Sequence, residues 1–256
     1  MTVLVTRPDE SGQALTQSLI GQGIPALHHA LITFAEGRDL AYLWPSLNQC
    51  DIAIAISPNA VRFCHQYLHR QGLNWPKSPR YLAIGQKTAH DLSKVTQQYV
   101  HYPSVSDSEH FLLLPELTQE QVANKRITIL RANSGRDLLK QQLIRRGAQV
   151  NYLTAYQKMA TTWSAEQQRD IWKKHKVDTI ILTSGEQIEL FCQPITAIDP
   201  KWLSQCTAVV PSERLVDFAN QWPWQKIYCS NGASNQQILR TITQFGFNDC
   251  ENMYDE

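Results

Sequence analysis

The chain repeats its own sequence, and this repeat restricts the fold more than any other feature. The stretch VLVTRPDESGQALTQSLIGQG, from Val3, aligns with ITILRANSGRDLLKQQLIRRG, from Ile127, at a constant offset of 124 residues. The run DIAIAIS, ending at Ser57, aligns with DTIILTS, ending at Ser184, at an offset of 127. A third pair follows in the same order, in which Ile84 of LAIGQKTAHDL is matched with Val209 of AVVPSERLVDF at an offset of 125. Three ordered segments at nearly one offset predict duplication of a strand–helix–strand unit, so that 256 residues are about 125 counted twice.

Short β-branched runs alternate with amphipathic helical patterns along the chain, which predicts an α/β fold with parallel sheets. The expected strands are Val3–Thr6, Ala26–Phe34, Asp51–Ser57, Tyr81–Ile84, Ile127–Arg131, Val150–Tyr156, Asp178–Ser184, Ala208–Pro211 and Lys226–Ser230. Two copies of the unit predict two parallel-sheet α/β domains with a cleft between them. Ligands of parallel sheets bind at the carboxyl ends of the strands, so the residues that follow each strand are the first candidates.

Small, hydroxyl and amide residues follow most of these strands, directly before a helix. A helix start leaves backbone N–H groups at the positive end of the helix dipole, and Ser or Thr adds a donor. Ordinary capping explains each serine taken singly, but several such starts together predict a rim that binds carboxylates or phosphates. The candidate ligand-binding residues are Arg7, Ser57, Asn59, Gly85, Lys87, Thr88, Arg131, Arg136, Thr183, Ser184 and Ser212.

Composition and motifs exclude several classes of protein. A net charge of +1 argues against a general nucleic-acid or membrane-surface binder. The letters GQGIPA, from Gly21, follow a helix and precede a strand, whereas a dinucleotide fingerprint needs the reverse order. Cys64, His65 and His69 share one helical stretch without further ligands, so we expect no metal site. Six scattered cysteines and an N-terminus without a signal-peptide pattern predict a reduced, cytoplasmic protein.

Tyr156, in YLTAYQKMA, ends a predicted strand at the place where the two halves are expected to meet. A tyrosine hydroxyl with its ordinary pKa near 10 stays protonated at neutral pH and can give a proton to a departing oxygen. Packing of the ring is the alternative interpretation, and the residue taken alone favours it.

Taken together, these segments resemble the uroporphyrinogen-III synthase family. The resemblance spans nearly the whole chain and is carried by VLVTRPDESGQAL, ISPNAV, LAIGQKTAHDL, ILRANSGRDLLKQQLIRRGAQV, AYQ, LTSGE and VPSERL. It implies two α/β domains joined by a two-stranded connection, one formed by residues 1–35 and 160–256 and the other by residues 37–157. It also implies a lyase that needs no metal or organic cofactor, and a monomer that acts on a tetrapyrrole substrate.

The family closes the linear tetrapyrrole hydroxymethylbilane to uroporphyrinogen III in haem biosynthesis, with inversion of ring D and loss of water. The substrate has eight carboxylates, which gives the predicted rim a ligand. The resemblance implies that backbone N–H groups after Ser57, Gly85, Ser184 and Ser212 hold carboxylate arms, that Lys87, Arg7, Arg131 and Arg136 add ion pairs, and that Thr88 and Ser212 are cleft hydroxyls. Tyr156 matches the tyrosine proposed to assist loss of the hydroxyl.

One residue departs from the family pattern. Where the family often has Gly-Pro-Thr-Thr, this chain has Val210-Pro211-Ser212-Glu213, which places a negative charge beside an expected carboxylate site. The alternative function, from another class, is a non-catalytic two-lobed binder or sensor of a polycarboxylate, in which Tyr156 only packs.

Overall fold

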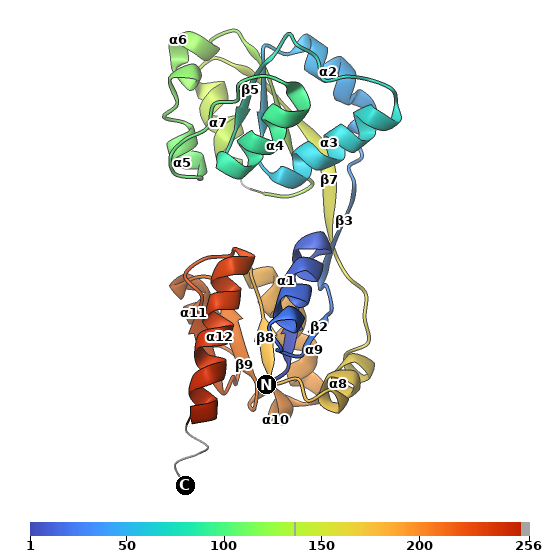
Figure 1. Ribbon diagram of the computed structural model, residues 1–256. Helices are drawn as coiled ribbons and strands as arrows, with labels where there is room; N and C mark the ends of the chain where they lie inside the picture. The colour runs from blue at the N-terminus through green and yellow to red at the C-terminus, as the bar shows by residue number, and fades with distance from the viewer. Residues whose placement is uncertain (136, 252–256) are drawn as a thin grey trace. The chain divides into compact units, whose positions relative to one another are not determined.

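The computed structural model describes residues 1–135 and 137–251, with side chains as far as Gln244. The chain divides into two compact units. Unit 1 consists of Met1–Thr33 and the chain from Met159 onward, and unit 2 is Phe34–Lys158. Each unit has a five-stranded sheet with helices on both faces (Figure 1). In the described part of the chain, no helix is long and apolar enough to cross a membrane.

Unit 1 has the strand order β10-β9-β8-β1-β2, and every neighbouring pair is parallel. Its strands are β1 (Val3–Val5), β2 (Ala26–His28), β8 (Thr179–Ile181), β9 (Thr207–Val210) and β10 (Lys226–Cys229). Its helices are α1 (Asp9–Gly21), α8 (Ala165–Lys174), α9 (Gly185–Ile198), α10 (Pro200–Leu203), α11 (Glu213–Ala219) and α12 (Asn235–Glu251). Because strand side chains alternate, Val3 and Val5 pack with α1 and α12, whereas Leu4 packs on the other face with α8 to α11.

Unit 2 has the strand order β3-β7-β6-β4-β5. Its strands are β3 (Ile32–Glu36), β4 (Ile52–Ala55), β5 (Arg80–Ala83), β6 (Arg126–Ala132) and β7 (Gln149–Ala160). One face carries η1 (Leu40–Tyr42), α2 (Leu43–Gln49), α3 (Pro58–Arg70) and α4 (Gln86–Thr96), and the other carries α5 (Ser108–Phe111), η2 (Pro115–Leu117), α6 (Gln119–Val122) and α7 (Leu138–Arg145). Strands β3 and β7 are neighbours and contain both points at which the chain passes between the units, which confirms the two-stranded connection.

The two sheets repeat one strand order, as the predicted duplication requires. The order β7-β6-β4-β5 in unit 2 corresponds to β2-β1-β8-β9 in unit 1. Gly23 and Gly147, 124 residues apart, both follow the equivalent helices with positive φ, 78° and 87°. The third sequence alignment was wrong by two residues, because the cap residues Gly85 and Ser212 are 127 apart. A two-residue slip preserves the alternation of inward and outward side chains, so apolar letters alone do not fix the offset.

Two predicted strands also differ from the structure. The run predicted as one strand over Ala26–Phe34 is divided into β2 and β3, which belong to different sheets. Between them, the backbone N–H of Leu31 bonds to Thr6 O at 3.4 Å, so the break is held against the end of β1. Strand β7 continues to Ala160, so Tyr156 lies within the strand and not at its end. The predicted α/β class with parallel sheets is confirmed.

Candidate functional site

The carboxyl ends of the parallel strands form one edge in each sheet. In doubly wound sheets, ligands bind at this edge, at the point where the strand order reverses direction. That point lies between β6 and β4 in unit 2 and between β1 and β8 in unit 1. Ser57 follows β4, and Ser184 follows β8, so the two equivalent serines lie at the two switch points.

In unit 2, two predicted site residues are in direct contact. Ser57 Oγ and Tyr156 Oη are 3.1 Å apart, and either oxygen can be the donor. Ser57 is the N-cap of α3, and its Oγ also accepts the backbone N–H of Ala60 at 3.1 Å. Since this 13-residue helix directs its N–H groups and positive dipole end at the serine, the hydroxyl pair lies in a positive local field.

The ring of Tyr156 is fixed by aromatic neighbours. It stacks on Phe63 of α3, with ring centres 5.8 Å apart and planes 9° apart, and meets Phe34 of β3 edge-on at 5.5 Å. The side chain is 9% exposed. Both earlier interpretations of Tyr156 are therefore compatible with the geometry, because the ring packs in the core while the hydroxyl reaches a polar partner at the sheet edge.

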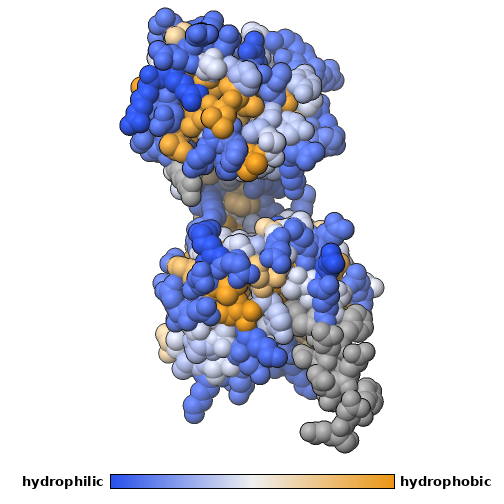
Figure 2. All heavy atoms as spheres, turned by 90° about the vertical axis from the view of Figure 1, so that its left-hand side faces the viewer, coloured by the Kyte–Doolittle hydropathy of each residue, from blue (hydrophilic) through white to orange (hydrophobic). Residues whose placement is uncertain are grey.

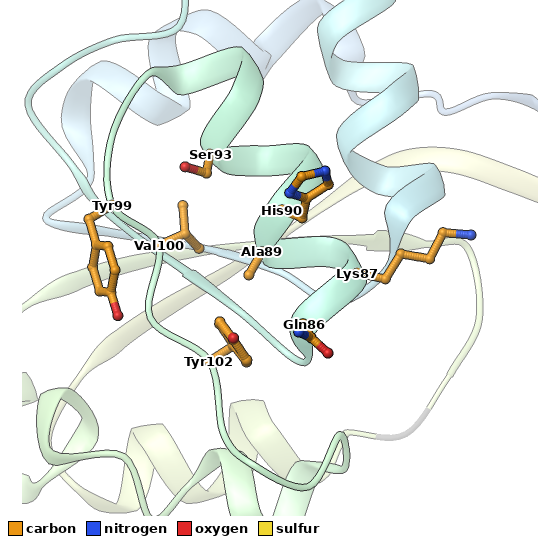
Figure 3. Close-up of a pocket in the computed structure, with 8 residues that line it drawn as sticks. All are labelled: Gln86, Lys87, Ala89, His90, Ser93, Tyr99, Val100 and Tyr102. Carbon is orange, nitrogen blue, oxygen red and sulfur yellow. The ribbon is translucent and has the colours of Figure 1, made fainter.

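The start of α4 presents three predicted residues in different ways. Gly85 is the N-cap, and a Cβ there would lie 2.2 Å from Ser106 Oγ, so this close approach requires glycine. Thr88 is almost wholly buried, at 3% exposure. Lys87 is exposed and borders a hollow of about 450 Å³. In Figure 3 its side chain points away from Tyr102, which lies on the opposite side of that hollow.

Some exposed apolar side chains of unit 2 lie beside α5, on the sheet face opposite α3. Figure 2 shows apolar side chains gathered on a face of this unit. Val105 and Leu113, which flank α5 in sequence, are 47% and 75% exposed. The helix α5 packs on the opposite side of the sheet from α3, so the Ser57–Tyr156 pair is distinguished by polar groups at strand ends and not by apolar exposure.

Arg131 of β6 is engaged with its own unit. Its Nη1 donates to Asp137 Oδ1 at 3.1 Å, and its guanidinium lies 4.2 Å from the centre of the Tyr152 ring. The Tyr152 hydroxyl donates to the same carboxylate at 3.0 Å, and this bond and the bond from Arg131 lower the pKa of Asp137. Arg131 therefore anchors the segment after β6. The predicted residue Arg136 lies outside the described residues.

Arg7 of unit 1 is also engaged with its own unit. Its Nη1 donates to Ala233 O and to Asn235 Oδ1, the latter at 2.8 Å, and burial lowers the pKa of the guanidinium. Its carbonyl oxygen accepts a contact from His28 Nε2 at 2.8 Å. Arg7 thus joins the end of β1 to the start of α12, a role that the sequence pattern did not indicate.

Gln187 organises the switch point of unit 1, and sequence reasoning missed it. Its Oε1 accepts from both the backbone N–H and the hydroxyl of Thr183, at 2.7 and 2.9 Å, and its Nε2 donates to Thr6 O at 3.3 Å. Ser184 Oγ in turn accepts the Gln187 N–H. The spacing Ser184-Gly-Glu-Gln187 matches a capping box, and this signal could have identified the glutamine from sequence.

Ser212 differs from the serine caps Ser57 and Ser184 because its side chain makes no cap bond. The neighbouring Glu213 occupies the first position of α11 and is exposed. Burial raises the pKa of the Cys229 thiol, and a hydrogen bond with Glu213 and its negative charge raise it further. Glu213 thus acts on the end of β10, the neighbour of β9 in the sheet.

The structure brings together only some of the predicted residues. The side chains of Ser57 and Tyr156 are within hydrogen-bond distance, and Asn59 follows in the first turn of α3. Thr183 and Ser184 both form hydrogen bonds with Gln187. The two arginines bind elements of their own units. Among the described residues, no group of three or more His, Cys, Asp or Glu side chains could hold a metal ion.

These features define a class: a duplicated α/β protein with polar strand ends and a hydroxyl pair held at one switch point. A protein-family model, uroporphyrinogen-III synthase HemD, matches residues 13–240. Uroporphyrinogen-III synthase of Salmonella typhimurium is 38% identical over 251 residues, covering 94% of this chain and all of the relative. That of Escherichia coli is 36% identical with the same coverage. The chain belongs to the uroporphyrinogen-III synthase family.

Solved structures show the same fold. Uroporphyrinogen III synthase of Thermus thermophilus, in a mutant form, superimposes with a TM-score of 0.62 at 16% identity, covering 95% of this chain and 98% of that chain. Uroporphyrinogen-III synthetase of Helicobacter pylori gives a TM-score of 0.59 at 16% identity, covering 96% of this chain and 100% of that chain. At this identity the likeness concerns the fold.

Proposed function

We propose that the protein is a cofactor-independent lyase that converts hydroxymethylbilane to uroporphyrinogen III. Membership of the family supports an enzyme of tetrapyrrole synthesis. The single observation that carries the chemistry is the Tyr156 hydroxyl, which is held 3.1 Å from Ser57 at the switch point of unit 2. This arrangement supplies a positioned proton donor beside the start of a long helix.

Tyr156 would give its proton to the hydroxyl that leaves the bilane, so that the leaving group departs as water. The electron-poor azafulvene that remains is then attacked by ring D through its substituted carbon, which gives a spiro intermediate. Ser57 can donate a hydrogen bond to the phenolate oxygen as its proton leaves, and the α3 dipole favours that negative charge. Holding the chain ends in a reactive geometry supplies the remaining catalysis.

The eight carboxylates need donors more than they need net positive charge. Helix starts after Ser57, Gly85 and Ser184 provide backbone N–H groups, and Lys87 is an exposed cation at the start of α4. We expect Arg7 and Arg131 to act by fixing strand ends, because each already binds groups of its own unit. Ser212, Thr88, Asn59, Thr183 and Arg136 remain proposed binding residues.

The test is incubation of the purified protein with freshly prepared hydroxymethylbilane, followed by separation of the uroporphyrin isomers after oxidation. We expect isomer III. A protein that only binds the substrate would leave isomer I, which forms spontaneously. Dialysis against a chelator should leave turnover unchanged, and the protein should sediment as a monomer. We also propose a cytoplasmic location, where scattered cysteines stay reduced.

A further inference from the structure

The orientation of Tyr156 depends on a β-bulge in β7. Opposite β6, Leu130 pairs with Leu153 and Arg131 with Thr154, but Ala132 pairs with Tyr156. Strand β7 therefore has one extra residue at this point. A bulge of this kind reverses the alternation of side chains beyond it.

The two faces of the sheet show the effect. Tyr152 packs on the face that carries α7, and Leu153 packs on the face that carries α3. Simple alternation would return Tyr156 to the face of Tyr152. Because of the extra residue, Tyr156 instead packs on the α3 face with Leu153, where Ser57 receives its hydroxyl.

Two residues of the segment after β3 hold this bulge. The backbone N–H of Gly37 donates to Ala155 O at 3.0 Å, and the Asp39 Oδ2 accepts the backbone N–H of Thr154 at 2.9 Å. A Cβ at Gly37 would lie 1.8 Å from Thr154 O, so only glycine permits this approach. Asp39 thus accepts a hydrogen bond from the backbone N–H of Thr154 in the bulge. Gly37 is buried and packs against the carbonyl oxygen of the same Thr154.

We propose that Gly37 and Asp39 are positioning residues that fix the Thr154–Ala155 bulge and thereby aim the Tyr156 hydroxyl at Ser57. This inference rests on the proposed function of Tyr156 but adds residues that neither contact the hydroxyl nor belong to the predicted rim. Since misplacement of a reacting group by about 1 Å can cost roughly 100-fold in rate, small shifts of the bulge are expected to affect turnover.

The main variant is Asp39→Ala, with Asp39→Asn as the conservative variant that keeps an acceptor oxygen. We expect Asp39→Ala to lower kcat roughly 10- to 100-fold with KM little changed, and Asp39→Asn to restore most of it. Arg70→Ala is the matched control, because it removes the exposed ion pair with Glu36 on β3 without touching the bulge. Should Asp39→Ala fail to fold, Asp39→Glu displaces the acceptor by one methylene and tests the same point.

A double-mutant cycle tests whether Asp39 acts through the tyrosine. In a Tyr156→Phe background, Asp39→Ala should lower kcat no further, because coupled residues are not additive. Equal fold-losses in both backgrounds, or full activity of Asp39→Ala, would overturn the proposal.

A readout independent of turnover separates this inference from the proposed function. With 3-fluorotyrosine incorporated, the Tyr156 fluorine resonance is assigned by its absence from Tyr156→Phe. Asp39→Ala should shift it, whereas Asp39→Asn and Arg70→Ala should leave it in place. An unmoved resonance in Asp39→Ala contradicts the positioning role. Wild-type protein that yields only isomer I contradicts the proposed function, and the fluorine shift still decides the inference.

Discussion

The two units share a strand order but use equivalent positions differently. At the unit 1 switch point, Gln187 binds both polar groups of Thr183 and the carbonyl of Thr6, so the strand ends are joined to each other. Its equivalent in unit 2, at the offset of 127, is Ala60, which has no polar side chain. The Ser57 hydroxyl there meets Tyr156 instead. One switch point is thus a structural junction, whereas the other holds the Ser57–Tyr156 hydroxyl pair.

The equivalent arginines show the same divergence. Arg7 joins β1 to the start of α12, whereas Arg131 lies over the Tyr152 ring and holds Asp137 in the segment after β6. Each donates hydrogen bonds to groups of its own unit. For these arginines, the repeated position serves the strand end in both halves, while the partners that differ between the halves give each arginine its individual role.

Tyr156→Phe should produce the largest effect, because it removes the proposed acid from unit 2 alone. Loss of a general acid lowers turnover by roughly 100- to 10,000-fold, whereas one hydrogen bond changes the free energy of unfolding by about 1 kcal/mol. Isomer III formation and urea unfolding measure the two effects. Tyr81→Phe is the control, since it removes a buried hydroxyl bond to Pro76 O in the same unit. Unaltered turnover in Tyr156→Phe would remove the tyrosine from the mechanism.

Gln187→Ala gives the unit 1 junction the side chain found at the equivalent position of unit 2. The residue is 2% exposed, so the groups it leaves behind are buried and unpaired. We expect the free energy of unfolding to fall by about 1–3 kcal/mol. Gln193→Ala, an exposed position on the same helix, should change it very little. Equal unfolding curves for the two variants would contradict the structural role of the junction.

The serine caps provide a matched pair. Ser57→Ala and Ser184→Ala each remove an N-cap, and each should lower the free energy of unfolding by about 1 kcal/mol. Only Ser57 bonds to Tyr156, so Ser57→Ala should lower kcat more than Ser184→Ala does. Ser57→Thr, which keeps the hydroxyl, should recover part of the loss. A larger kinetic effect at Ser184 would place the chemistry in unit 1.

The repeat made much of the fold predictable from sequence. Alternating strand and helix patterns give the α/β class, and the repeat gives two similar sheets, because each copy must bury the same faces. The division of Ala26–Phe34 into β2 and β3 was not predictable, since a continuous apolar run carries no sign of a change from one sheet to another. The two-residue error in the third alignment arose because strand side chains alternate with a period of two, so a slip of two residues leaves the apolar pattern unchanged.

The candidate site was less accessible to sequence reasoning. Ser57 and Tyr156 were identified, but their contact depends on a bulge, and the letters around Thr154 do not mark one. Asp39 and Gly37 lie more than a hundred residues away from β7 in the chain, and only the fold brings them to it. The arginines were assigned to ligand binding because charge can be read from sequence, whereas an internal partner cannot.

The smallest expected effect concerns two acids, one in each unit. Hydrogen bonds from Tyr152 and Arg131 lower the pKa of Asp137 in unit 2, and a hydrogen bond from Lys173 lowers that of Asp199 in unit 1. Because the folded-state pKa lies below the ordinary value of 3.8, each ionised group stabilises the fold above that pH. This contribution is lost as the pH falls through the folded-state value.

Urea unfolding at pH 6 and pH 3 therefore should show a stability difference between wild type and Asp137→Asn that shrinks at the lower pH, and Asp199→Asn should behave alike. The units should differ in turnover. Asp137 belongs to the segment after β6, one of the two strands that flank the unit 2 switch point, while Asp199 caps α10. Asp137→Asn should thus reduce isomer III formation slightly and Asp199→Asn should not. An equal kinetic loss in both variants would show that the segment after β6 has no special relation to the site, and that its acid matters only for folding.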